Sequence, residues 1–270
     1  MLSYTSLLLI LGILIAHFIV IERMARYRYV PLLFSLLAIL SVPIWMQKFD
    51  GWFYIVKILS VWVPITIYAV IKASYPSSDR MKRWATIFAK ASFFLLTLNI
   101  LEASVKDLIQ QNTLNGITGI LLIVVLPLIS KDNWNAINYK HQPFVIKANT
   151  PFFYIFLYSS WNVCFVYTVF PEYFFVVVIS LLYCFIHVWF TKSPNLWFTF
   201  RTFTLGFILM LRANSYLVEN HLDFGYLHNE AVGSIWGLVN LVLILGYAIY
   251  SYKGELKSSA LGLGLNKTRA

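Results

Sequence analysis

Residues 4–28 have the sequence YTSLLLILGILIAHFIVIERMARYR, in which an apolar run over 4–21 leads directly into Arg23, Arg26 and Arg28. An apolar run of about 18–20 residues is long enough to cross the hydrocarbon core of a bilayer as a helix. Basic residues beside such a helix stay on the cytoplasmic side. No basic segment precedes the run and no small-residue cleavage motif follows it. We therefore predict an uncleaved first membrane helix with the N-terminus outside.

The alternation of apolar and basic segments continues along the whole chain. Fifteen of the 21 Lys and Arg residues fall in every second connection, three in the opposite connections and three inside the apolar segments, when Lys72 and Arg212 are counted with the connections they adjoin. This asymmetry is the positive-inside pattern of a multi-span membrane protein. We predict an all-α transmembrane helix bundle, N-terminus outside and C-terminus inside, with nine spans at about 4–21, 30–46, 52–73, 84–105, 114–130, 151–170, 173–191, 196–214 and 231–252.

The composition indicates one membrane-embedded domain. Hydrophobic residues make up 60% of the 270 residues and charged residues 12%, so apolar side chains must also cover the outer surface. We assign 1–252 to a single bundle and 253–270 to a basic cytoplasmic tail. Basic loops facing anionic lipid explain the net charge of +10 without nucleic acid as a partner. The expected partner is the lipid bilayer, the expected location is a bacterial inner (plasma) membrane, and an oligomer is compatible with the sequence.

Polar side chains inside the apolar segments are the candidate site residues, because an unpaired charge at the bilayer centre costs roughly 2.5–3.5 kcal/mol. Counting from the span ends places Lys57, Asn99 and Glu102 near the outer side, and Asp107 just beyond them. Asn99 and Glu102 are three residues apart and share one helix face. Glu102 and Lys57 are predicted at matching depths. Their ion pair is either a cation or proton site, or a structural link between two helices.

Two further polar layers are predicted deeper in the bundle. The middle layer consists of Tyr158, Asn162 and Asn240, and the inner layer of His17, Lys90, His187 and Arg201. Amides at mid-depth either bind a solute or join neighbouring helices. The inner group is either a proton relay or anion site, or a set in which the cations extend to the membrane surface. Gly233 and Gly237 lie four apart in the last span and predict close helix packing.

Three strings among these polar residues resemble an uncharacterised family of bacterial multi-span membrane proteins. They are Asn99-Ile100-Leu101-Glu102-Ala103 followed by Asp107, Tyr158-Ser159-Ser160-Trp161-Asn162, and Arg201-Thr202 at the opening of a helix. The matching stretches cover about a fifth of the chain. The family has no established activity, so the resemblance implies no chemistry. The resembling strings contain five of the polar residues that depth also selects as candidates: Asn99, Glu102, Asp107, Asn162 and Arg201.

The sequence carries none of the motifs GxSxG, HExxH or GxxxxGK[ST], so no catalytic residue, metal or cofactor is indicated. Two function classes remain. One is a transporter or channel for a small solute or ion, with the three polar layers as its route. The other is a lipid-binding protein or lipid-modifying enzyme that holds a phosphate with His187 and Arg201 at the inner leaflet. Convergence of the layers on one cavity favours the first class, and a lateral opening beside His187 and Arg201 favours the second.

Overall fold

The computed structural model describes residues 4–48, 52–75, 78–130, 134–139, 142–148, 150–214 and 225–260. In this part of the chain the fold is all-α apart from one β-hairpin. The helices are α1 (Tyr4–Ala16), α2 (Glu22–Arg26), α3 (Val30–Leu40), α4 (Val42–Lys48), α5 (Trp52–Ser74), α6 (Asp79–Ile109), α7 (Thr113–Ser130), α8 (Phe152–Val169), α9 (Phe174–Phe190), α10 (Trp197–Asn214) and α12 (Glu230–Ala260). A π-helical turn, His17–Ile21, joins α1 to α2 without a break.

Six helical stretches in the described ranges are long and apolar enough to cross a membrane. They are Leu8–Arg26, Val30–Gln47, Asp79–Ile109, Phe152–Val169, Pro171–Phe190 and Glu230–Lys253. The predicted helical membrane fold is therefore confirmed at this level, and these helices fit an integral membrane protein. The count of nine spans and the orientation of the termini stay predictions.

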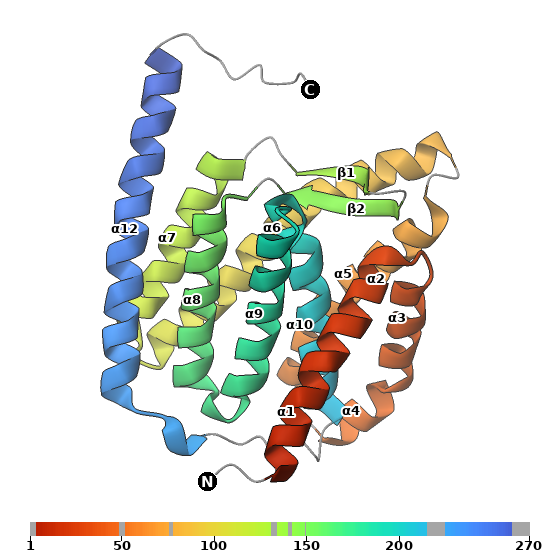
Figure 1. The fold of residues 1–270 in the computed structure, drawn as a ribbon, viewed down its shortest axis with the longest axis horizontal. Coiled ribbons are helices and arrows are strands. Elements are labelled where there is room, and N and C mark those ends of the chain that lie inside the picture. The colour runs from red at the N-terminus through yellow and green to blue at the C-terminus, as the bar shows by residue number, and fades with distance from the viewer. Residues whose placement is uncertain are drawn as a thin grey trace.

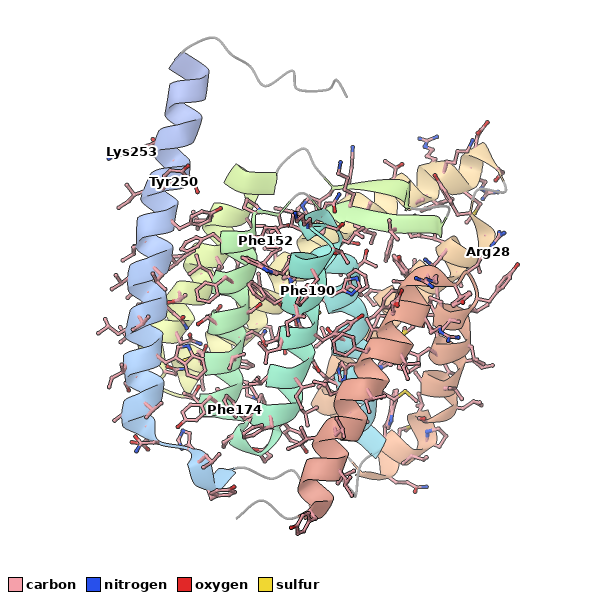
Figure 2. The ribbon with its side chains drawn as sticks, viewed as in Figure 1. Arg28, Phe152, Phe174, Phe190, Tyr250 and Lys253 are labelled. Atoms are coloured by element: carbon pink, nitrogen blue, oxygen red, sulfur yellow. The ribbon has the colours of Figure 1, made fainter. Side chains whose placement is uncertain are left out.

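The helices pack side by side, and the hairpin lies across one end of the bundle (Figure 1). Arg28 and Lys253 lie toward the hairpin end, whereas Phe174 lies toward the opposite end (Figure 2). Helix α6 crosses the bundle obliquely behind α8 and α9 (Figure 1). Its 31 residues are more than a perpendicular crossing of a bilayer requires. This oblique course brings α6 residues that are far apart in sequence to one side of the interior.

The β-hairpin departs from the prediction, in which residues 131–150 between the spans 114–130 and 151–170 form a connection on the cytoplasmic side. Strands β1 (Trp134–Tyr139) and β2 (Gln142–Ala148) pair antiparallel, with Trp134 opposite Ala148. Thr199 of α10 occupies the edge of β2: its hydroxyl accepts from the Ile146 amide at 3.2 Å and donates to the Ile146 carbonyl at 3.1 Å. An edge whose backbone groups are paired in this way is protected from pairing with other chains. The hairpin is thus part of the packed bundle.

Lys72, near the end of α5, ties the hairpin to the helices. This side chain is fully buried, and its ammonium donates to the carbonyl of Ala25 at 2.7 Å and to that of Phe144 at 3.3 Å. The Tyr68 hydroxyl also donates to the Phe144 carbonyl, at 3.2 Å. Ala25 lies in the last turn of α2, where exposed carbonyls favour a cation. Lys72 therefore links three elements instead of extending to the membrane surface.

The positive-inside arrangement makes a direct prediction about accessibility. Arg80, at the start of α6, and Lys253, in α12, are both exposed and are expected on the cytoplasmic face. Tyr226, before α12, is 69% exposed and is expected on the outer face. In a background without Cys164 and Cys184, an impermeant maleimide added to intact cells should label Tyr226→Cys. It should label Arg80→Cys and Lys253→Cys only after permeabilisation. Labelling of these two from opposite sides would contradict the topology.

Candidate binding cavity

A cavity of about 190 Å³ lies between α5, α6, α8 and α10. Its wall is mainly apolar, and Ile146 of strand β2 forms part of it at the hairpin end. Along α6 the lining extends from Phe88 to Glu102, a distance on the order of 20 Å at the helical rise. The polar side chains of the lining come from all four helices: Ser60, Tyr68, Ser92, Asn99, Glu102, Tyr158, Arg201 and Thr202.

The cavity brings together predicted site residues from all three layers. Asn99 and Glu102 come from the outer layer, Tyr158 from the middle layer and Arg201 from the inner layer. They meet because α6 runs obliquely, so positions of different predicted depth face the same space. One elongated cavity therefore connects groups that the sequence analysis placed in separate layers.

Arg201 is the most constrained of these groups. It lies one turn into α10 and is 4% exposed. Its Nε donates to the Tyr158 hydroxyl at 3.3 Å, and its guanidinium carbon lies 5.8 Å from the centre of the Tyr158 ring. The buried Nη1 has no hydrogen-bond partner among the described residues. Because buried polar groups are nearly always paired, this unpaired donor on a residue that lines the cavity makes Arg201 the group most able to take a further acceptor.

Tyr158 is held in place by aromatic packing. It is fully buried on α8, with ring centres 5.8 Å from Trp161 and 4.9 Å from Trp197. The contact with Trp197 is edge-to-face, a favourable arrangement for aromatic rings. This packing fixes the position of the hydroxyl that accepts from Arg201.

Glu102 and Asn99 lie on the face of α6 that borders the cavity. Glu102, Leu98 and Ser60 of α5 are all exposed, so the cavity opens on the flank of the bundle between α5 and α6. Lys57, the predicted partner of Glu102, lies in α5 one turn before Ser60 and Val61. The Lys57 side chain lies outside the described part of the structure.

Asp107 and Asn240, also predicted as site residues, belong instead to a hydrogen-bonded network of α6, α7, α8 and α12. Asp107 is fully buried, and its two carboxylate oxygens accept from Asn112 and Asn115, each at 2.7 Å. The Asn115 amide nitrogen also donates to the Trp161 carbonyl at 3.3 Å, and its side-chain oxygen accepts from Asn240 at 3.3 Å. With its donors and acceptors satisfied within the protein, this network joins the helices.

The network continues from Asn240 to the helix surface. Ser160 donates to the Asn240 side-chain oxygen at 2.7 Å and accepts from the Trp236 indole at 3.0 Å. The predicted close approach of the last helix is present: a Cβ on Gly233 would lie 2.7 Å from Thr168 Cγ2, and one on Gly237 would lie 3.2 Å from the Asn115 backbone nitrogen. These glycines allow α12 to reach α7 and α8.

The remaining predicted residues do not border the cavity. Asn162 is buried on α8, and half-buried His187 packs on Phe200 with ring centres 4.1 Å apart. His17 is fully buried, where Nδ1 contacts the Ile13 carbonyl at 2.8 Å and Nε2 the Ser180 hydroxyl at 2.6 Å. His187 thus does not line the cavity that Arg201 lines.

The polar cavity residues Ser60, Tyr68, Ser92 and Thr202 were not among the predicted site residues, and neither was buried Lys72 beside the hairpin. A hydroxyl in an apolar helix gives little signal, because it can bond to the preceding turn of its own helix, as Ser92 does with the Phe88 carbonyl at 2.8 Å. Lys72 did have a signal, because it is an ionisable residue at the end of an apolar segment. In the described ranges no group of three His, Cys, Asp or Glu side chains is placed to hold a metal ion.

Comparison of the chain with protein-family models, with curated proteins and with solved structures finds no match.

Proposed function

We propose that the protein is a membrane transporter or channel for a small solute or ion, and that the cavity holds the solute. The convergence of Asn99, Glu102, Tyr158 and Arg201 on one cavity carries this proposal. Ionisable groups inside apolar helices are costly, and they commonly mark the route of a polar solute. Arg201 is such a group, since its Nε donates to the neutral Tyr158 hydroxyl and its Nη1 has no hydrogen-bond partner among the described residues.

The two ends of the cavity differ in a way that suits a solute route. Glu102 lies at the exposed end, whereas Tyr68 and Ile146 border the end beside the hairpin and are buried. In the conformation described here, the route is open on one side and covered by the hairpin on the other. Transport would require α10 or the hairpin to shift, as in transporters that expose a central site to each side in turn.

A lipid ligand is the second candidate, because the mouth lies on the flank of the bundle. Leu98 is 59% exposed beside Glu102, so in a bilayer this mouth would face acyl chains. The sequence analysis placed the lipid phosphate between His187 and Arg201. The structural support for a lipid ligand is instead the flank opening near Ser60 and Leu98.

Glu102→Gln should lower solute uptake at least tenfold, because it removes the charge at the exposed end of the cavity while keeping the side-chain shape. Purified protein would be reconstituted in liposomes, and uptake of labelled benzoate, benzylamine, leucine and rubidium ion would be compared with protein-free vesicles. Glu230→Gln is the matched control, since Glu230 is exposed at the start of α12 and does not border the cavity.

Unchanged uptake by folded Glu102→Gln protein would contradict the role of the cavity. Flipping of a fluorescent phospholipid without movement of any solute would favour the lipid candidate instead.

A further inference from the structure

We propose that the cavity binds an organic anion, a carboxylate attached to an apolar body, with the carboxylate against Arg201. This inference rests on the proposed function only in that both place the ligand in the same cavity. It assigns the chemical class of the ligand, which the transport proposal leaves undefined.

Arg201 recognises the head group of the ligand. A guanidinium keeps its charge at any physiological pH and binds carboxylates through its N–H groups. Nε is occupied by Tyr158, whereas buried Nη1 is unpaired. The Tyr158 hydroxyl accepts from Arg201 and carries a hydrogen of its own that it can donate. A carboxylate at this place would accept from both groups, and charge-assisted bonds of this kind are the stronger ones.

The remainder of the cavity recognises an apolar body. Val61, Phe88, Leu95, Phe198 and Leu205 line it from α5, α6 and α10. A space of about 190 Å³ with such walls holds an aromatic ring or a short aliphatic chain. A strongly hydrated inorganic anion would lose its water against these walls without sufficient replacement. The ligand class is therefore an amphipathic anion and not free phosphate or sulfate.

The positions of the two charged residues define the orientation of the ligand. Arg201 is only 4% exposed, whereas Glu102 is exposed at the mouth of the cavity. The carboxylate must therefore lie at the inner end, away from Glu102, and the apolar body extends toward the mouth. Two sources supply this chemistry: a small carboxylate dissolved in water, or a fatty acid that enters from the bilayer past Leu98.

Binding to the full chain in lipid nanodiscs tests the inference without any transport measurement. Isothermal titration would compare benzoate, benzyl alcohol and benzylamine, which share a ring and differ in the head group. We expect benzoate to bind at least tenfold more tightly than the other two. Laurate should displace labelled benzoate if the mouth admits a fatty acid, whereas benzoate binding without displacement by laurate identifies a water-soluble source.

Arg201→Gln should weaken benzoate binding at least tenfold, and Arg201→Lys should weaken it less because it keeps the charge but loses the planar fork. Arg83→Gln is the matched control: it removes one positive charge from the exposed side of α6 and does not border the cavity. Size-exclusion chromatography establishes that each variant is folded. If Arg201→Gln does not fold, the comparison of the three head groups in the wild-type protein still decides the ligand class.

The outcomes separate this inference from the transport proposal. Preference for benzylamine, or equal benzoate binding by wild type and both Arg201 variants, would overturn the anion assignment while uptake of another solute would keep the transport proposal. Benzoate binding that depends on Arg201, without uptake into liposomes, would support the anion site and contradict transport. Absence of both binding and uptake would overturn both.

Discussion

Gly119→Val is expected to destabilise the bundle severely, by about 3 kcal/mol, because it forces a side chain into a close-packed contact. Gly119 lies in α7, against Ser104 of α6 and Trp161 of α8. A Cβ at this position would overlap Ser104 Oγ and would lie 2.8 Å from Trp161 Nε1 and 2.9 Å from Trp161 Cε2.

Neither neighbour of Gly119 can move without losing a hydrogen bond. The Ser104 hydroxyl donates to the Ile100 carbonyl at 2.8 Å, and the Trp161 indole donates to the Asn115 carbonyl at 3.0 Å. The midpoint of thermal unfolding in detergent measures the effect. Gly246→Val is the matched control, because nothing lies within 4 Å of a Cβ at Gly246 in the exposed surface of α12. Equal midpoints for the two variants would show that α7 does not pack as described.

Asp107→Asn is expected to lower the free energy of unfolding by about 2–4 kcal/mol. Each buried donor that loses its acceptor costs about 1–3 kcal/mol. The new amide nitrogen would face the amide of Asn112 or Asn115, so a donor would oppose a donor. Asn115 is fully buried and has no access to water as a replacement. The loss would extend to Asn240, which donates to the Asn115 side-chain oxygen.

The same substitution elsewhere in α6 provides the comparison. Asp79 is exposed at the start of the helix, where it pairs with Lys82 at 2.9 Å. Asp79→Asn should change stability little, because an exposed ion pair contributes little and water replaces it. Urea or SDS titration of the purified variants would measure both changes. A loss at Asp107 no greater than that at Asp79 would refute the structural role of the network.

The membrane helices were predictable because each requires only a continuous apolar run and basic or turn residues at its ends. The run over 4–21 and the arginines after it illustrate this, and the structure continues the helix to Arg26. The hairpin was not predictable in the same way. Its strands are short, and the edge of β2 is bonded to Thr199, which lies 53 residues from Ile146 in sequence.

Several residues of the candidate site were predictable from the sequence, but which of them border the same cavity was not. Counting residues from the ends of a span assumes that helices cross the membrane at similar angles. Oblique α6 breaks this assumption and brings Asn99 to the same cavity as Arg201. Asp107 shows the opposite case, because a buried carboxylate in a satisfied network has the same sequence signature as one in a site. Only the arrangement of Asn112 and Asn115 around it separates the two.

The mouth between α5 and α6 has a consequence for any measurement of affinity. In a bilayer, this opening would border hydrocarbon tails, so a tail or a detergent molecule can fill the space when no ligand is present. Each binding event then becomes an exchange of one occupant for another. Apparent affinity will consequently vary with the chain length of the surrounding amphiphile, even though no residue of the protein has changed.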